Sequence, residues 1–147
     1  MRGAYRVIAY LIALGVLSQA AAVAGGWFGT INEIDDGTVI TEDYEGNLGH
    51  AMHWIVGMNI MPLLGLILFI IAFFVKLPGA VKWAGFTFLA IIVQIALAFI
   101  SFGVPAIGAL HGINAFVVLG LALYTARSVA SGVAPEPVHG TGTPAAV

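Results

Sequence analysis

The stretch that decides the fold is residues 46–57, GNLGHAMHWIVG, in which two histidines stand at the start of a long apolar segment. The residues before it form an acidic connection, and the residues after it stay apolar as far as Val75. A second stretch, residues 108–114 (GALHGIN), leads into another apolar run in the same way. Apolar runs of about 20 residues are long enough to cross a bilayer as helices. The two histidine-led stretches therefore predict two membrane-spanning helices that start on the same side.

The composition of the whole chain indicates an integral membrane protein of one domain. Of its 147 residues, 61% are hydrophobic and 8% are charged, and the mean hydropathy is +1.04. Soluble domains carry about 25% charged residues. The expected surroundings are thus the lipid bilayer. Basic residues are too scattered to indicate a nucleic-acid partner.

The absence of cysteine excludes several kinds of site. The chain has no cysteine, so it has no disulfide framework, thiolate metal site, iron–sulfur cluster or covalently attached c-type haem. No Ser-His-Asp, phosphate-loop or zinc-protease motif occurs in the sequence, so hydrolytic or transferase chemistry has no support and no catalytic residue is assigned.

Four apolar runs predict an all-α, transmembrane up-down-up-down four-helix bundle that occupies residues 1–127. The expected spans are residues 7–25, 48–75, 84–102 and 105–127, and Pro62 should kink the second one. The first run also resembles a secretory signal, with a small-residue end at 22–24, and both interpretations remain open. Residues 128–147 are rich in Ser, Gly, Pro, Ala and Thr. They predict a disordered cytoplasmic tail that includes His139.

The acidic connection, residues 26–47, holds six carboxylates and no basic residue. Its Asp35-Asp36-Gly37 turn signal, between residues 30–32 and 38–41, predicts a small hairpin on the membrane surface. Its carboxylates do not have the spacing of an EF-hand calcium site. We therefore expect a solvated outer loop.

The basic residues predict the orientation in the membrane. Arg2, Arg6, Lys76, Lys82 and Arg127 all fall at one end of an alternating bundle. Lysine and arginine close to span ends mark the cytoplasmic side. We expect a multi-pass protein of a bacterial plasma membrane, with both termini cytoplasmic and the acidic loop outside.

The histidines of the second and fourth spans are the candidate site. In an up-down-up-down bundle these spans run in the same direction and lie diagonally opposite. His53 and His111 each lie about five residues into their spans, so at roughly 1.5 Å per residue they reach similar depth. His50 shares a helix face with His53, one turn nearer the water. Asn114 lies one turn below His111 and is expected to support a ligand.

Matched depth on diagonal helices is what two histidine ligands of one haem iron require. Three interpretations remain open: haem ligation by His53 and His111, a proton or substrate role, and histidines that merely lie at the interface beside Trp54. Within the haem interpretation, His50 is an alternative to His53 as the ligand from the second span.

A resemblance enters with GHAMHWIVG at residues 49–57 and LHGINAF at residues 110–116. These stretches resemble the histidine-led spans of four-helix membrane haem proteins, namely one half of haem A synthase and the small membrane b-type cytochromes. The chain also looks like a family of small four-span bacterial membrane proteins without an assigned function. The resemblance implies haem b bound by His53 and His111 near the outer face, for electron transfer or haem handling. Haem A synthase has two four-helix halves, whereas this chain has one. The resemblance therefore also implies that two chains would have to pair as a homodimer for a synthase-like activity.

The alternative function is a non-enzymatic accessory or structural subunit of a larger membrane complex, without a cofactor. A small transporter is the weakest hypothesis, because no charged residue falls at mid-membrane depth in any expected span.

Overall fold

The computed structural model describes residues 1–128. It consists of helices, and no strand occurs in this part of the chain. The elements in chain order are α1 (Arg2–Asp35), α2 (Leu48–Ile55), the π-helical turn η1 (Val56–Ile60), α3 (Met61–Ala72), α4 (Ala80–Gly103), the 3₁₀ turn η2 (Pro105–Ile107) and α5 (Gly108–Ser128). Apart from Ser128, the tail expected at residues 128–147, with His139, lies outside the described residues.

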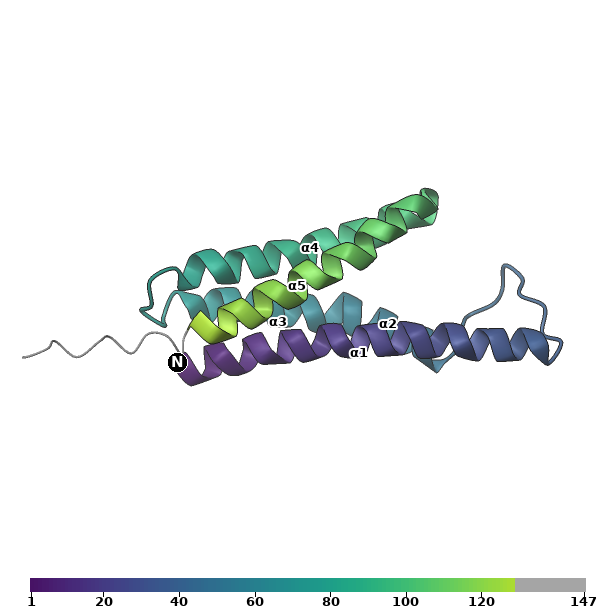
Figure 1. Ribbon diagram of the computed structural model, residues 1–147, viewed down its shortest axis with the longest axis horizontal. Coiled ribbons are helices and arrows are strands. Elements are labelled where there is room, and N and C mark those ends of the chain that lie inside the picture. The colour runs from purple at the N-terminus through teal and green to yellow at the C-terminus, as the bar shows by residue number, and fades with distance from the viewer. Residues whose placement is uncertain (129–147) are drawn as a thin grey trace, which may run out of the picture.

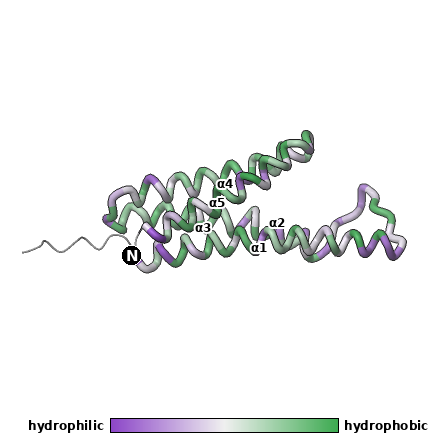
Figure 2. The backbone as a smooth tube through the Cα atoms, viewed as in Figure 1, coloured by the Kyte–Doolittle hydropathy of each residue, from purple (hydrophilic) through white to green (hydrophobic). Residues whose placement is uncertain are grey.

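These elements form four candidate membrane spans, which confirms the all-α four-helix bundle. The spans are α1, the continuous segment Leu48–Ala72, α4, and Pro105–Ser128, each long and apolar enough to cross a bilayer. Figure 2 shows hydrophobic residues along the helices, and hydrophilic residues near the N-terminus and in the last turns of α1. The protein is therefore an integral membrane protein by the length and composition of its helices.

The four spans are arranged in a ring. Helix α1 packs on α2, α3 and α5, while α4 packs on α3 and α5 (Figure 1). The second and fourth spans are consequently diagonal to each other, as the sequence predicts.

The buried core lies at the end of the bundle that holds the N-terminus. Its largest members, Tyr5, Ile12, Leu68 and Val118, are fully or almost fully buried. The Tyr5 hydroxyl donates a hydrogen bond of 2.9 Å to the Ala80 carbonyl, which ties α1 to the start of α4. At the other end, α2 contains no buried residue. The α4–α5 pair diverges there from α1 (Figure 1).

The hairpin expected between residues 30 and 41 is wrong, because α1 continues through Thr30 to Asp35. The turn signal ends this helix instead. Gly37 has a φ of +98°, its N–H bonds the Ile34 carbonyl, and the Thr38 N–H bonds the Glu33 carbonyl. These two bonds satisfy carbonyls that a helix end leaves free, in a Schellman motif. The loop is thereby shortened to residues 36–47.

Next to Pro62, where a kink is expected, the structure has the π turn η1 directly before α3. Proline has no N–H to bond the carbonyl four residues earlier, and its ring clashes with that carbonyl. In η1 the Met61 N–H bonds the Val56 carbonyl, five residues back. The Asn59 side chain bonds the Ile55 carbonyl at 2.9 Å. The irregular backbone therefore lies one turn below His53.

Candidate functional site

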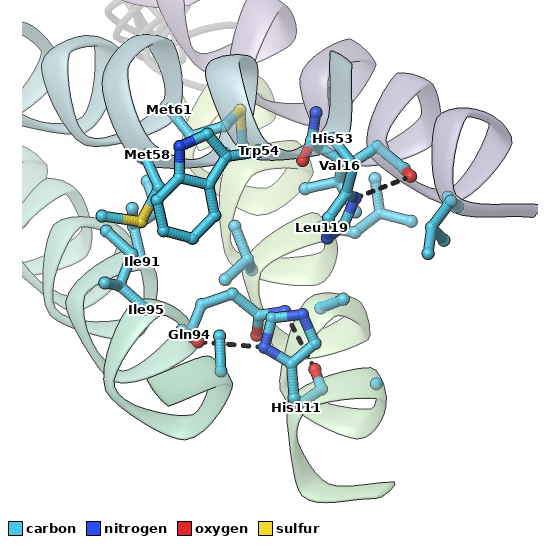
Figure 3. Close-up of a pocket in the computed structure, with 18 of the residues that line it drawn as sticks. Val16, His53, Trp54, Met58, Met61, Ile91, Gln94, Ile95, His111 and Leu119 are labelled. Carbon is cyan, nitrogen blue, oxygen red and sulfur yellow. Dashed lines mark hydrogen bonds between the residues drawn. The ribbon is translucent and has the colours of Figure 1, made fainter. Parts of the chain in front are cut away.

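His53 of α2 and His111 of α5 face each other across the open half of the bundle. Their ring centroids are 6.3 Å apart and the ring planes are inclined by 67°. Figure 3 shows the two imidazoles projecting from opposite sides into one cavity. The expectation of matched depth on diagonal helices is therefore confirmed as geometry.

Each imidazole is fixed by a backbone carbonyl of a neighbouring helix. His53 Nδ1 lies 3.1 Å from the carbonyl oxygen of Gln19 in α1, and His111 Nδ1 lies 3.0 Å from that of Gln94 in α4. A carbonyl can only accept, so Nδ1 carries the proton in both rings. In the neutral rings, both Nε2 atoms therefore keep their lone pairs. The same arrangement fixes the tautomer of histidines that bind metal.

Gln94 and Asn114 form a polar network behind His111. The Gln94 amide donates to the His111 carbonyl at 2.9 Å. Asn114 donates to the Gln94 side-chain oxygen at 2.7 Å and to the Ala90 carbonyl at 2.9 Å. Asn114 thus joins α5 to α4 and does not line the cavity. It supports His111 through Gln94 rather than by direct contact.

The space between the histidines is a cavity of about 410 Å³. That volume is within the usual range of small-molecule sites, about 300–1,000 Å³. Its walls come from α1, the second span, α4 and α5, and they include Ala115 and Gly112, where a Cβ would meet nothing within 4 Å. No Lys, Arg, Asp or Glu lines it. The other walls are mostly apolar, and the labelled ones in Figure 3 are Val16, Trp54, Met58, Met61, Ile91, Ile95 and Leu119.

His50 lies elsewhere, in the first turn of α2. Its Nδ1 accepts from the Asn47 N–H at 3.4 Å, as the second half of a capping box. Its Nε2 is buried without a hydrogen-bond partner, and the ring meets the Trp27 indole edge-on at 5.3 Å. His50 lines a different cavity, of about 500 Å³, under the loop. The structure therefore brings His53, and not His50, to His111.

Asn47 fastens the start of α2 to α1. Its amide donates to the Gly26 carbonyl at 2.7 Å, and its side-chain oxygen accepts from the Gly49 N–H at 3.0 Å. This cap satisfies one of the free N–H groups at the helix start. The depth of His53 follows from it, because α2 begins at a fixed point on α1.

The loop is held by a second set of hydrogen bonds. The Tyr44 hydroxyl lies 2.8 Å from the Thr30 hydroxyl and donates to Glu33 at 2.7 Å. The bond with Thr30 lowers the pKa of the Tyr44 phenol. The bond to Glu33 and the negative charge of Glu33 raise it, so that the pKa of Tyr44 is above its ordinary value. The acidic loop is therefore an ordered part of this end of the protein.

Within residues 1–128, no group of three or more His, Cys, Asp or Glu side chains is placed to hold a metal ion. A metal between His53 and His111 would thus take its remaining ligands from a cofactor or from solvent.

Comparison with protein-family models, with curated proteins and with solved structures finds no match for this chain. The fold and the site together define its class, an all-α integral membrane protein of four spans with two facing histidines in an apolar cavity.

Proposed function

We propose that this protein binds one haem b between His53 and His111, for electron transfer or haem handling. The observation that carries the proposal is the pair of imidazoles whose Nδ1 atoms are both engaged by carbonyls, while both rings face one cavity. The resemblance of the histidine-led spans to those of membrane haem proteins points the same way.

The spacing of the rings supports a single ion between them. Metal–nitrogen bonds are about 2.0–2.1 Å long, so two imidazoles that hold one ion have to lie within a few ångströms of each other. The observed separation is 6.3 Å. The two rings cannot satisfy each other, because both Nε2 atoms are acceptors.

The apolar lining of the cavity supports the proposal, because the macrocycle of a haem is apolar. His53 and His111 would hold the iron, and Gly112, next to His111 in the chain, leaves open space on the cavity wall. The apolar walls would exclude water and lower the local dielectric around the iron, which is one of the ways a protein sets a reduction potential.

The proposal gives each residue of the site a role. His53 and His111 would hold the iron, and the carbonyls of Gln19 and Gln94 hold their Nδ1 protons and ring orientation. Trp54, Met58 and Phe99 wall the cavity. A bound haem would supply one-electron iron chemistry, which no side chain of this site can provide.

The proposal includes the orientation in the membrane. The basic residues of the described chain (Arg2, Arg6, Lys76, Lys82 and Arg127) fall at the ends of spans away from the acidic loop. The positive-inside rule then puts both termini in the cytoplasm and the histidine cavity near the outer face of a bacterial plasma membrane.

The test is an absorption spectrum of the protein purified from haem-replete cells. We expect a Soret band in the parent protein, and its loss in both His53→Ala and His111→Ala. His50→Ala is the matched control and should keep the band, because His50 caps α2 and does not reach the cavity. A colourless parent protein would refute the proposal. Loss of the band in His50→Ala but not in His53→Ala would move the ligand to His50.

A further inference from the structure

The wall of the histidine cavity is incomplete between α2 and α4. In residues 1–128, α2 packs extensively only on α1 and on the π turn that follows it. Contact across this side is made by the rings of Trp54 and Phe99, with centroids 6.2 Å apart and planes inclined by 79°. On the other side of the cavity α1 packs on α5, but exposed residues of these helices, Leu17 and Phe116, also line the cavity. The helices therefore leave an opening in the wall between α2 and α4, and two aromatic side chains fill it.

This opening faces the surroundings of the spans and not the bundle interior. Trp54 is 52% exposed and Phe99 is 50% exposed, although both line the cavity. Both residues lie inside segments that can cross a membrane. The exposed surface of such segments is covered by lipid chains, so on this side only the rings of Trp54 and Phe99 separate the cavity from the bilayer.

The acidic loop disfavours the entry of haem into the cavity from the aqueous side. Loop residues Asp36, Glu42, Asp43 and Glu45 are exposed, and the loop contains no basic residue. Haem carries two propionate groups that are negative at neutral pH, and like charges repel. No cation lines the cavity to offset that repulsion. A haem dissolved in the bilayer would instead meet an apolar, aromatic opening.

Resting on the proposed haem site, we infer that the ligand is taken from the bilayer itself, sideways between α2 and α4 past Trp54 and Phe99. Its source is thus haem already dissolved in lipid. Trp54 and Phe99 control the rate at which haem reaches the site, whereas His53 and His111 determine how tightly it is held.

The test uses the absence of native cysteine. In the double variant Trp54→Cys/Phe99→Cys, a short bis-methanethiosulfonate bridges the two helices by forming a reducible disulfide with each cysteine and releasing methanesulfinate. Apoprotein in vesicles is mixed with haemin-loaded vesicles, and the rate of Soret appearance is followed. We expect the bridge to slow uptake by about tenfold or more, since closing an opening limits access, and reduction of the bridge to restore it. The two single-cysteine variants, treated with the same reagent, are the controls.

Two alanine variants test which side of the cavity the haem passes. Phe99→Ala should speed uptake, whereas Phe116→Ala, which removes an exposed aromatic cavity residue from α5, should leave the rate unchanged. Faster uptake in Phe116→Ala but not in Phe99→Ala would overturn the route between α2 and α4. Unchanged uptake in the bridged protein would overturn the sideways route and leave the haem proposal intact. Failure of the parent protein and of all variants to bind haem at equilibrium would overturn both.

Discussion

At the scale of residues, the sequence predicts where the two cavity histidines lie but not which groups hydrogen-bond their rings. The positions of His53 and His111 are predictable, because equal distance into two diagonal helices means equal depth. The partners of their Nδ1 atoms are backbone carbonyls of Gln19 and Gln94. Every residue has a carbonyl, so no residue type marks these two. Only the packing of α1 on α2 and of α4 on α5 selects them.

The side chain of Gln94 gives a prediction about the support of His111. Gln94→Leu removes the bonds to the His111 carbonyl and to Asn114 but keeps the backbone carbonyl that holds Nδ1. We expect a loss of about 1–3 kcal/mol in stability, because partners in an apolar setting stay unsatisfied. Haem affinity should fall by about 10–100-fold, as for other residues that support a metal ligand. Thermal unfolding in detergent, followed by circular dichroism, and haem titration measure the two effects.

Gln19→Leu is the matched control for Gln94→Leu. Gln19 lines the same cavity from α1, and none of the hydrogen bonds described for residues 1–128 involves its side-chain amide, while its carbonyl holds His53. Its replacement should cost clearly less stability than that of Gln94. Equal losses in the two variants would mean that the Gln94 network does not stabilise α5.

At the scale of elements, the apolar runs predict four helices but not all of their ends. The Asp35-Asp36-Gly37 signal is a turn in either interpretation, and the sequence does not say whether a helix or a strand precedes it. A helix rather than a strand precedes the turn, because the Schellman hydrogen bonds from Gly37 and Thr38 satisfy the last carbonyls of the helix. Helix α1 thus has 34 residues. That is about 50 Å at 1.5 Å per residue, against a hydrocarbon core of about 30 Å.

The close approach of α2 to α1 leads to a second prediction. A Cβ on Gly49 would lie 2.6 Å from the Ala22 carbonyl oxygen and 2.6 Å from the Gly26 Cα. Both are backbone atoms, which cannot move away as a side chain can. We expect Gly49→Ala to separate the two helices, lower the melting temperature and weaken haem binding, because His53 would move away from the Gln19 carbonyl.

Gly25→Ala provides the comparison for Gly49→Ala. A Cβ at Gly25 meets nothing within 4 Å, and alanine is favoured over glycine within a helix by about 1 kcal/mol. This variant should melt at the same temperature as the parent or slightly higher. If the two variants Gly49→Ala and Gly25→Ala have the same melting temperature, the contact between α1 and α2 is less close than the structure shows.

At the scale of the whole molecule, the ring order of the spans follows from their alternation, but the divergence at one end does not. The tight end is built from fully buried residues such as Tyr5, Leu68 and Val118, whereas the other end has a cavity and an incomplete wall. In a membrane span, lipid-facing and buried positions are both apolar. The sequence therefore predicts a bundle but does not show where the bundle opens.

The orientation of the whole molecule gives the last prediction, and the cysteine-free sequence makes it direct to measure. Asp43→Cys puts a thiol in the exposed acidic loop, and Pro78→Cys puts one in the exposed turn before α4. In intact cells, a membrane-impermeant thiol reagent should label Asp43→Cys at once and Pro78→Cys only after permeabilisation, because lysine and arginine near span ends are retained inside. The opposite pattern would put the histidine cavity at the cytoplasmic face. Electrons or haem would then have to be exchanged with partners on that side.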